Sequence, residues 1–308
     1  TNASDGTWTP AETVAAVKLA GIGLFSVTDH DATGNVAPTA RLAAAAGLAF
    51  IPGVEISATL AGRLFHILGY GVDPENEALA AVDAANAALM EEVDHYSIKK
   101  LAAAGFPVDY GEFCAYEHDP ARGGWKSLSY LIDKGLCRGV ADFFAKLFTP
   151  ALGIAFPAFA SPAAVIEAVK AAGGVAVLAH PGSEFHGPAL EETLDMFAAE
   201  AIEGVECFHL CHDAAATRRA CGTVRASSAH SGSAGGPMWP QPRGQSSTTP
   251  ARSENARSTS SEAMCARPKD RIPGVSITPA STKLGSAPRQ FAKHFRTVRI
   301  RPAGPPRR

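Results

Sequence analysis

Five acidic or histidine residues sit in or beside turns at the ends of expected strands, and their chemistry is that of metal ligands. They are Asp5, His30, Glu55, His66 and His180. Imidazole and carboxylate together suit Zn²⁺, Mn²⁺ or Fe²⁺ better than Mg²⁺ or Ca²⁺, which favour shells of oxygen alone. A histidine at a strand end is more often a hydrogen-bonded structural residue than a ligand. Recurrence at equivalent places nevertheless predicts a clustered site, which can hold metal ions about 3.5–4 Å apart and act on a phosphoryl group.

One stretch near the N-terminus must position two of these residues. Its apolar run at residues 24–27 predicts a buried strand, and a T-D-H-D turn with His30 follows directly. An alanine-rich helix is expected at residues 33–46, with a C-terminal glycine directly after it. A second buried strand is expected at residues 48–51, with Glu55 just beyond it. Parallel α/β enzymes build their sites in this way, from strands that end in ligand-type side chains and are joined by crossover helices.

Later segments repeat the arrangement. Residues 64–68 are strand-like with a histidine in the middle, and the buried run at residues 175–179 ends in His180. A further strand is expected at residues 204–208, ending in His209. The pattern therefore predicts an α/β fold with ligand-type residues at or near the same ends of its strands.

Residues 75–150 differ in character, because their apolar residues have helical spacing and no buried strand interrupts them. We expect a helical insertion there. One of its loops places Arg122, Trp125 and Lys126 together, and such a loop could cover a site and contact an anionic substrate. An ordinary surface loop explains the same residues equally well.

The composition excludes some classes of protein. A hydrophobic fraction of 46% and a charged fraction of 19% suit a globular protein, and no apolar run reaches the roughly 18 residues that span a bilayer. The six cysteines form no compact disulfide framework, so we expect the reduced thiols of a cytoplasmic protein. A soft-metal site at Cys207, Cys211 and His212 is an alternative. Nothing in the sequence points to a particular oligomeric state.

The net charge of −2 hides a split along the chain. Residues 1–219 carry 13 basic and 27 acidic residues, whereas residues 220–308 carry 15 and 3. The periodic apolar pattern stops at about residue 219, so we expect residues 219–308 to form a disordered, basic low-complexity tail. A shifted reading frame in GC-rich DNA produces such an abrupt change. Nucleic-acid binding by the tail is less favoured, because few aromatic residues lie among its arginines.

Five short motifs then occur in a recognisable order. They are S-D-G at 4–6, T-D-H-D at 28–31, G-V-E-I-S at 53–57, H-I-L-G-Y at 66–70 and A-H-P-G at 179–182. In order and spacing they resemble the PHP family, the polymerase and histidinol phosphatase superfamily of metal-dependent phosphoesterases. The resemblance covers about residues 1–218. The helical stretch before the A-H-P element is similar to the insertion of the branch that acts on nucleotides and short oligonucleotides.

This resemblance implies a distorted (βα)7 barrel, with barrel segments at residues 1–74 and 151–218 around the insertion at residues 75–150. It also implies two or three divalent metal ions, often Mn, Zn or Fe. The implied reaction is hydrolysis of the 5′-phosphates of nucleotides or short oligonucleotides by a metal-bound hydroxide.

The resemblance also implies roles for individual residues. Carried over by motif, the metal ligands are Asp5, His30, Glu55, His66 and His180. The catalytic residues among them are Glu55, which would bridge metal ions, His30 and Asp5. Arg122 and Lys126 are the expected contacts to the substrate phosphate.

Two departures from the family pattern matter. The family has an H-x-H pair on its first strand and a G-S-D-x-H element late in its site, and neither occurs in this sequence. Residues 182–187 are superficially similar to the second element but directly follow the A-H-P element. We therefore expect an incomplete barrel and impaired activity.

Two rival functions remain open from the sequence. A non-catalytic PHP remnant would bind a nucleotide or a protein partner. An amidohydrolase-like metal hydrolase would cleave C–N bonds and would want a carboxylated lysine at a strand end, where this sequence has none. The binding partners we expect are therefore a small phosphoester or a short oligonucleotide, and no membrane.

Overall fold

The computed structural model describes residues 1–183, 187 and 189–230 of this chain. The described part is a mixed α/β fold. Its helices are α1 (Pro10–Leu19), α2 (Val36–Ala45), α3 (Glu77–Ala103), α4 (Tyr110–Ala115), α5 (Lys126–Asp133), α6 (Val140–Lys146), α7 (Pro162–Ala171), α8 (Leu190–Ala198) and α9 (Ala214–His230), with short 3-10 turns at Pro120–Arg122 and Pro150–Leu152. Its strands are β1 (Leu24–Ser26), β2 (Ala49–Ile51), β3 (Gly53–Leu60), β4 (Arg63–Tyr70), β5 (Val175–Leu178) and β6 (Gly204–Val205).

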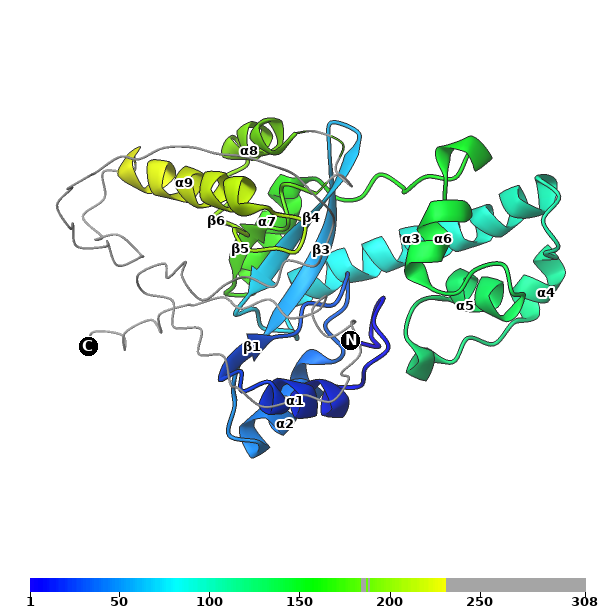
Figure 1. The fold of residues 1–308 in the computed structure, drawn as a ribbon, viewed down its shortest axis with the longest axis horizontal. Coiled ribbons are helices and arrows are strands. Elements are labelled where there is room, and N and C mark those ends of the chain that lie inside the picture. The colour runs from blue at the N-terminus through cyan, green and yellow to red at the C-terminus, as the bar shows by residue number, and fades with distance from the viewer. Residues whose placement is uncertain (184–186, 188, 231–308) are drawn as a thin grey trace, which may run out of the picture. The chain divides into compact units, whose positions relative to one another are not determined.

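These strands form two sheets. Strands β1 and β2 pair in parallel, and the second sheet has the order β3-β4-β5-β6 (Figure 1). Within it, β4 is antiparallel to both β3 and β5, and only β5 and β6 are parallel. The likeness to parallel α/β enzymes, seen in the strand and helix pattern of the sequence, therefore does not extend to the pairing of β3 with β4. The reason is local, because Ala61 and Gly62 form a two-residue turn with φ of +50° and +74°. Such a turn makes a hairpin and leaves no room for a crossover helix.

The position of Glu55 is also corrected. It lies inside β3 and not in a turn beyond the preceding strand. Pro52 separates β2 from β3, so the chain starts a new strand two residues before Glu55.

Several helix ends carry residues that favour them, and the glycine expected after the helix at residues 33–46 is confirmed. Thr9 caps α1 through a capping box with Glu12, and Pro10 occupies the first turn. Gly47 follows α2 with φ of +74°, a conformation that favours glycine. Ser161 caps α7 by accepting a hydrogen bond from the Ala164 amide.

The main core lies between the four-stranded sheet and α7, which packs against β3, β4 and β5 (Figure 1). Apolar side chains from alternate positions of these strands meet the buried side of α7. Ile56 of β3, Ile67 of β4 and Val165 of α7 are each fully buried. Helix α8 adds Phe197, which packs edge-to-face on Phe65 of β4 with ring centroids 5.0 Å apart.

Residues 77–146 form helices α3 to α6 with no strand among them. Their aromatic and aliphatic side chains make a core of their own, in which Phe113, Leu131 and Phe143 are nearly or fully buried. A buried polar contact joins two of these helices, since Asp94 on α3 accepts hydrogen bonds from the amide and hydroxyl of Ser127 at the start of α5.

The C-terminal boundary also differs from expectation. Helix α9 runs through residues 219–230, where we predicted disorder, and Asp213 caps it by accepting from the Ala215 and Ala216 amides. The remainder of the predicted basic tail, residues 231–308, lies outside the described residues. No helix in the described part of the chain is long and apolar enough to cross a membrane.

The Asp94 carboxyl generates a prediction about stability and pH. Burial raises its pKa to about 6, although the Ser127 hydrogen bonds act in the opposite direction. A carboxyl group with a raised folded-state pKa stabilises the fold below its unfolded pKa and loses this contribution as the pH rises through the folded value. We expect Asp94→Asn, which still offers Ser127 an acceptor, to raise the Tm relative to wild type more at pH 7.5 than at pH 4.5.

Thermal unfolding followed by circular dichroism checks this. The matched control is Glu92→Gln, which removes an exposed carboxylate from the same helix. A Tm difference between Asp94→Asn and wild type that stays constant over this pH range contradicts the prediction.

Candidate metal centre

The turn that carries His30 is held against β3 by backbone hydrogen bonds. The Asp31 amide donates to the Glu55 carbonyl at 2.8 Å, and the Glu55 amide donates to the Asp29 carbonyl at 3.0 Å. His30 and Glu55 consequently form an isolated parallel bridge, which links the segment after β1 to the larger sheet.

Close packing at Gly53 supports this arrangement. A Cβ atom there would lie 2.9 Å from Thr28 Cγ2 and 3.0 Å from the Val27 carbonyl oxygen, closer than side chains pack. Glycine therefore lets the start of β3 approach the segment that leads into the His30 turn.

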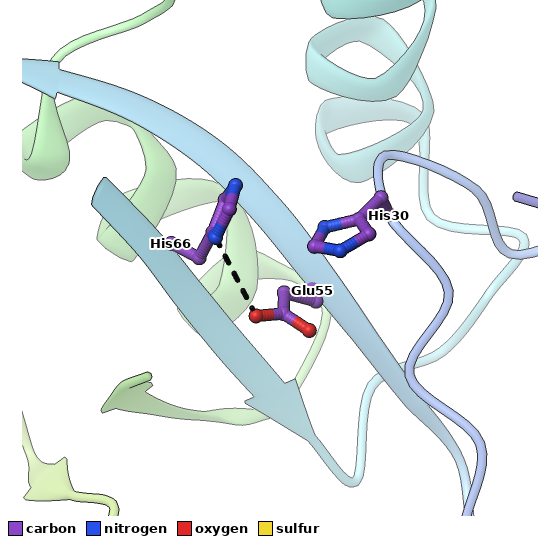
Figure 2. Close-up of side chains that lie close together, drawn as sticks. All are labelled: His30, Glu55 and His66. Carbon is purple, nitrogen blue, oxygen red and sulfur yellow. Dashed lines mark ion pairs between the residues drawn. The ribbon is translucent and has the colours of Figure 1, made fainter. Parts of the chain in front are cut away.

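Strands β3 and β4 bring Glu55 and His66 to one face. His66 lies directly opposite Ser57 in the antiparallel register, and Glu55 precedes Ser57 by two residues on the same strand. Glu55 and His66 are therefore diagonal neighbours on one side of the sheet. Figure 2 shows their side chains pointing toward each other, with His30 approaching from its turn.

His180 enters from the end of β5. It follows Ala179, whose amide donates to the His66 carbonyl, so the segment after β5 still runs beside β4. The backbone of His180 has φ of +28°, and Glu206 accepts its amide hydrogen at 2.8 Å. A non-glycine residue in this region persists only where its surroundings determine it, and such residues concentrate at functional sites.

The side-chain atoms of these residues converge. The His180 Nε2 and Glu55 Oε1 atoms are 3.0 Å apart, His66 Nδ1 and Glu55 Oε1 are 3.7 Å apart, and His66 Nδ1 and His180 Nε2 are 3.3 Å apart. His30, Glu55 and His66 also each offer a ligand atom within 4.8 Å of the others. Glu55 is 3% exposed, and His66 and His180 are each 8% exposed.

These distances fit a metal ion. Ligand atoms bound at about 2.1 Å in a tetrahedral zinc site lie about 3.4 Å from one another. The three separations of 3.0, 3.3 and 3.7 Å scatter around this value. Two or three imidazoles with one carboxylate is a donor set that zinc, manganese and iron accept. The residues present therefore fit a divalent metal ion.

Asp5 is not part of the group of residues whose ligand atoms lie within 4.8 Å of one another. It lies half-buried in the turn at residues 2–5. This turn contacts the loop that precedes α5, since the Gly124 amide donates to the Ser4 carbonyl at 2.5 Å and a Cβ atom at Gly123 would collide with the Gly6 carbonyl. The role of Asp5 as a ligand stays a prediction.

Arg122 and Lys126 lie at this same loop but are engaged within the helical region. The Arg122 guanidinium makes two hydrogen bonds of 2.8 Å to the Asp133 carboxylate, and this contact lowers the pKa of Asp133 to about 2. The Lys126 ammonium donates to the Cys114 carbonyl at 3.1 Å and lies 4.9 Å from the centroid of the Phe113 ring.

One further side chain, that of His209, adjoins the site and was not among the predicted ligands. The ring of His209 lies 5.2 Å from that of His180, and its Nδ1 lies 2.9 Å from Cys211 Sγ. The sequence signal that could have identified His209 as a site residue is its position at the end of the strand expected at residues 204–208, where the structure has β6. His212 instead links loops, because its Nε2 accepts from the Gly182 amide and its Nδ1 lies 3.1 Å from the Cys207 carbonyl oxygen. The G-S-E-F-H segment at residues 182–186 falls partly outside the described residues.

Several known proteins are similar to this chain in sequence. A 3′,5′-nucleoside bisphosphate phosphatase from Chromobacterium violaceum is 32% identical over 207 residues, which cover 66% of this chain and 72% of the phosphatase. The 5′-3′ exoribonuclease Rnm of Escherichia coli is 29% identical over 212 residues, which cover 62% of this chain and 72% of that enzyme. No protein-family model matches the chain.

Two solved structures superpose on the described fold with a TM-score of 0.64 and 27% sequence identity each. One is of an amidohydrolase from Chromobacterium violaceum with bound sulfate and covers 74% of this chain and 81% of its own. The other is described as a metal-dependent phosphoesterase from Bifidobacterium adolescentis and covers 74% and 82%.

The mixed α/β fold and the histidine–glutamate cluster thus define a metal-dependent hydrolase of phosphoric esters. The chain belongs to the family of phosphoesterases that contains the 3′,5′-nucleoside bisphosphate phosphatase of Chromobacterium violaceum. This membership is consistent with the PHP-type motifs of the sequence.

The cluster generates a prediction about metal binding. Glu55→Gln removes the buried negative charge from the donor set and should lower the affinity for Zn²⁺ or Mn²⁺ about tenfold or more. Loss of a group that only hydrogen-bonds a ligand already lowers metal affinity about 10–100-fold. Equilibrium dialysis with elemental analysis of bound metal measures the effect. The matched control is His118→Gln, a half-buried histidine in the helical region. Equal metal binding by Glu55→Gln and wild type would contradict the assignment.

Proposed function

We propose that this chain hydrolyses the 5′-phosphate esters of nucleotides or short oligonucleotides. The observation that carries the proposal is the convergence of Glu55, His66 and His180 within 3.7 Å of one another, beside His30, in a relative of a nucleoside bisphosphate phosphatase. We further propose that the metal ions are Mn²⁺, Zn²⁺ or Fe²⁺ and that two or three are bound. Donor chemistry supports these ions over Mg²⁺ and Ca²⁺.

In this proposal each residue of the centre has a role. His30, Glu55, His66, His180 and Asp5 hold the metal ions. A bound divalent ion activates water as a nucleophile and balances the negative charge of the phosphoryl group. Glu55 supplies the negative charge that favours cation binding in a buried site, and its Oε1 lies 3.7 Å from His66 Nδ1 and 3.0 Å from His180 Nε2. That Glu55 would be shared by two ions rests on the resemblance of its motif. His30 is only half-buried, which leaves a side open to substrate.

We propose that Arg122 and Lys126 bind the substrate phosphate. Support comes from the contact of their loop with the turn that contains Asp5. The Arg122–Asp133 pair is exposed, so it contributes little to stability and can be exchanged for a phosphate. Arginine suits this task, because its planar guanidinium binds phosphate through two parallel hydrogen bonds.

We also propose that the two sheets are parts of a distorted (βα)7 barrel of PHP type, made by residues 1–74 and 151–218, with residues 75–150 inserted as a helical subdomain. The His30–Glu55 bridge between the sheets and the separate aromatic core of α3 to α6 support this division. Because the H-x-H and G-S-D-x-H elements are absent from the sequence, we propose that turnover by this chain is slow.

The experiment that tests the function is metal-dependent release of inorganic phosphate. We expect purified chain supplied with Mn²⁺ to release phosphate from AMP and from a 5′-phosphorylated dinucleotide, slowly but above a Glu55→Gln control. Chelation of the metal should abolish the release. Dihydrouracil, a cyclic amide, is tested in parallel as a substrate for C–N bond cleavage. One structural neighbour is described as an amidohydrolase, which makes this the competing reaction. Opening of this ring without phosphate release would contradict the proposal.

The role of Arg122 predicts opposite effects of two substitutions. Arg122→Ala should raise KM for AMP about fivefold with little change in kcat, because a contact made equally in the ground and transition states is lost. Asp133→Asn should lower KM, because it frees the guanidinium. Steady-state kinetics measure both constants. The control is Arg138→Ala, an exposed arginine of the same region paired with Asp142. Equal KM values in all four proteins would exclude Arg122 as a substrate contact.

A further inference from the structure

Asp31 occupies an unusual place beside the candidate metal centre. It directly follows His30, and its backbone has φ of +47°, in the left-handed region. Its carboxylate accepts from the Ser57 amide at 2.8 Å and from the Ser57 hydroxyl at 2.6 Å. These bonds tie the His30 turn to β3 two residues beyond Glu55.

A third donor to Asp31 comes from outside both sheets. The Nδ2 atom of Asn86, on α3, donates to Asp31 Oδ1 at 2.7 Å and to the Ser57 carbonyl at 2.9 Å. Both amide hydrogens of Asn86 are used, one on the turn and one on the strand. Asn86 is 1% exposed, so these bonds are shielded from solvent.

Asn86 links the helical region to the segments that carry two of the candidate metal ligands. Residues 31, 57 and 86 belong to three segments, and α3 is the first helix of the helical region. One side chain of that region therefore holds together the two backbone segments that carry His30 and Glu55. His30 lies in the turn after β1 and Glu55 in β3, so their separation depends on how the turn and the strand are held. Two backbone hydrogen bonds join these segments at Glu55, and Asn86 adds a side-chain link at Asp31 and Ser57.

The surroundings explain why an amide stands at this position. Asp83 lies one turn earlier on α3, is 9% exposed and interacts unfavourably with the Asp31 charge. A carboxylate at position 86 would add a third negative group and could donate no hydrogen bond to Asp31. A neutral amide supplies two donors without adding charge.

We propose that Asn86 is a positioning residue for the metal centre, which sets the separation of His30 and Glu55 by binding Asp31 and the Ser57 carbonyl at once. The inference rests on the proposed metal-dependent function. It assigns to the helical region a second task besides substrate contact, namely shaping the ligand set of the centre. Groups that orient metal ligands in this way commonly change metal affinity 10–100-fold when removed.

Metal affinity of the full chain tests the inference. Mn²⁺ is titrated into wild type, Asn86→Ala and Asn86→Asp, and free Mn²⁺ is followed by electron paramagnetic resonance well below the Tm of each protein. We expect affinity to fall about tenfold in Asn86→Ala and further in Asn86→Asp. Ser57→Ala, which removes only the hydroxyl donor, should have a smaller effect and provides a second readout if the Asn86 variants fold poorly.

Ser97→Ala is the matched control. Ser97 lies on the same helix, is 2% exposed and has a hydroxyl with no hydrogen-bond partner among the described residues, so its loss should shift the Tm at most. If the Asn86 variants fold and bind Mn²⁺ as tightly as wild type and Ser97→Ala, the inference about Asn86 is wrong, whereas the proposed function is unaffected. Absence of Mn²⁺, Zn²⁺ and Fe²⁺ binding by the wild-type chain would overturn the proposed function and the inference together.

Discussion

The carboxylate of Glu55 is the group on which much of this structure depends. It is almost fully buried and lies 3.0 Å from His180 Nε2 and 3.7 Å from His66 Nδ1. A buried carboxylate is stable only when cationic or hydrogen-bonding groups surround it. Protonated imidazole or a metal ion can meet this need, and the spacing of the donor atoms suits an ion. The backbone of the same residue also hydrogen-bonds the His30 turn. Glu55 therefore supplies the negative charge of the site and also fixes where the His30 turn pairs with β3.

The mixed sheet meets this need. Side chains from the turn after β1, from β4 and from the end of β5 reach one carboxylate. The hairpin of β3 and β4 brings His66 to the same face as Glu55, and β5 adds His180 from the other side of β4. Left-handed backbone at Asp31 and His180 turns the chain sharply at two of these points. Hydrogen bonds from Ser57 and Asn86 to Asp31, and from His180 to Glu206, hold both turns in place.

The helical region has its own aromatic core, and Leu79 of α3 also packs in the main core beside α7. Polar groups add further contacts to the rest of the chain. Asn86 reaches the His30 turn, and the loop at Gly123 and Gly124 contacts the segment that contains Asp5. A region that folds around its own core can change its exposed loops without disturbing the sheet. Polar contacts at its boundary fix the orientation of the contacting segments more narrowly than apolar packing does, because hydrogen bonds depend on angle as well as distance.

The sequence alone determined the class of chemistry, the helix ends and the location of most strands. Capping residues at Thr9 and Ser161 and the glycine after α2 act within a few residues, so their effects can be read locally. The types and order of His30, Glu55, His66 and His180 likewise pointed to a metal site before any geometry was known. Only the tertiary structure decided that Glu55 lies inside a strand, that β4 runs antiparallel to its neighbours, and that Asn86 and His209 adjoin the site. These facts depend on which segments pair across long stretches of chain, and pairing is set by the packing of whole strands and helices, which no local pattern contains.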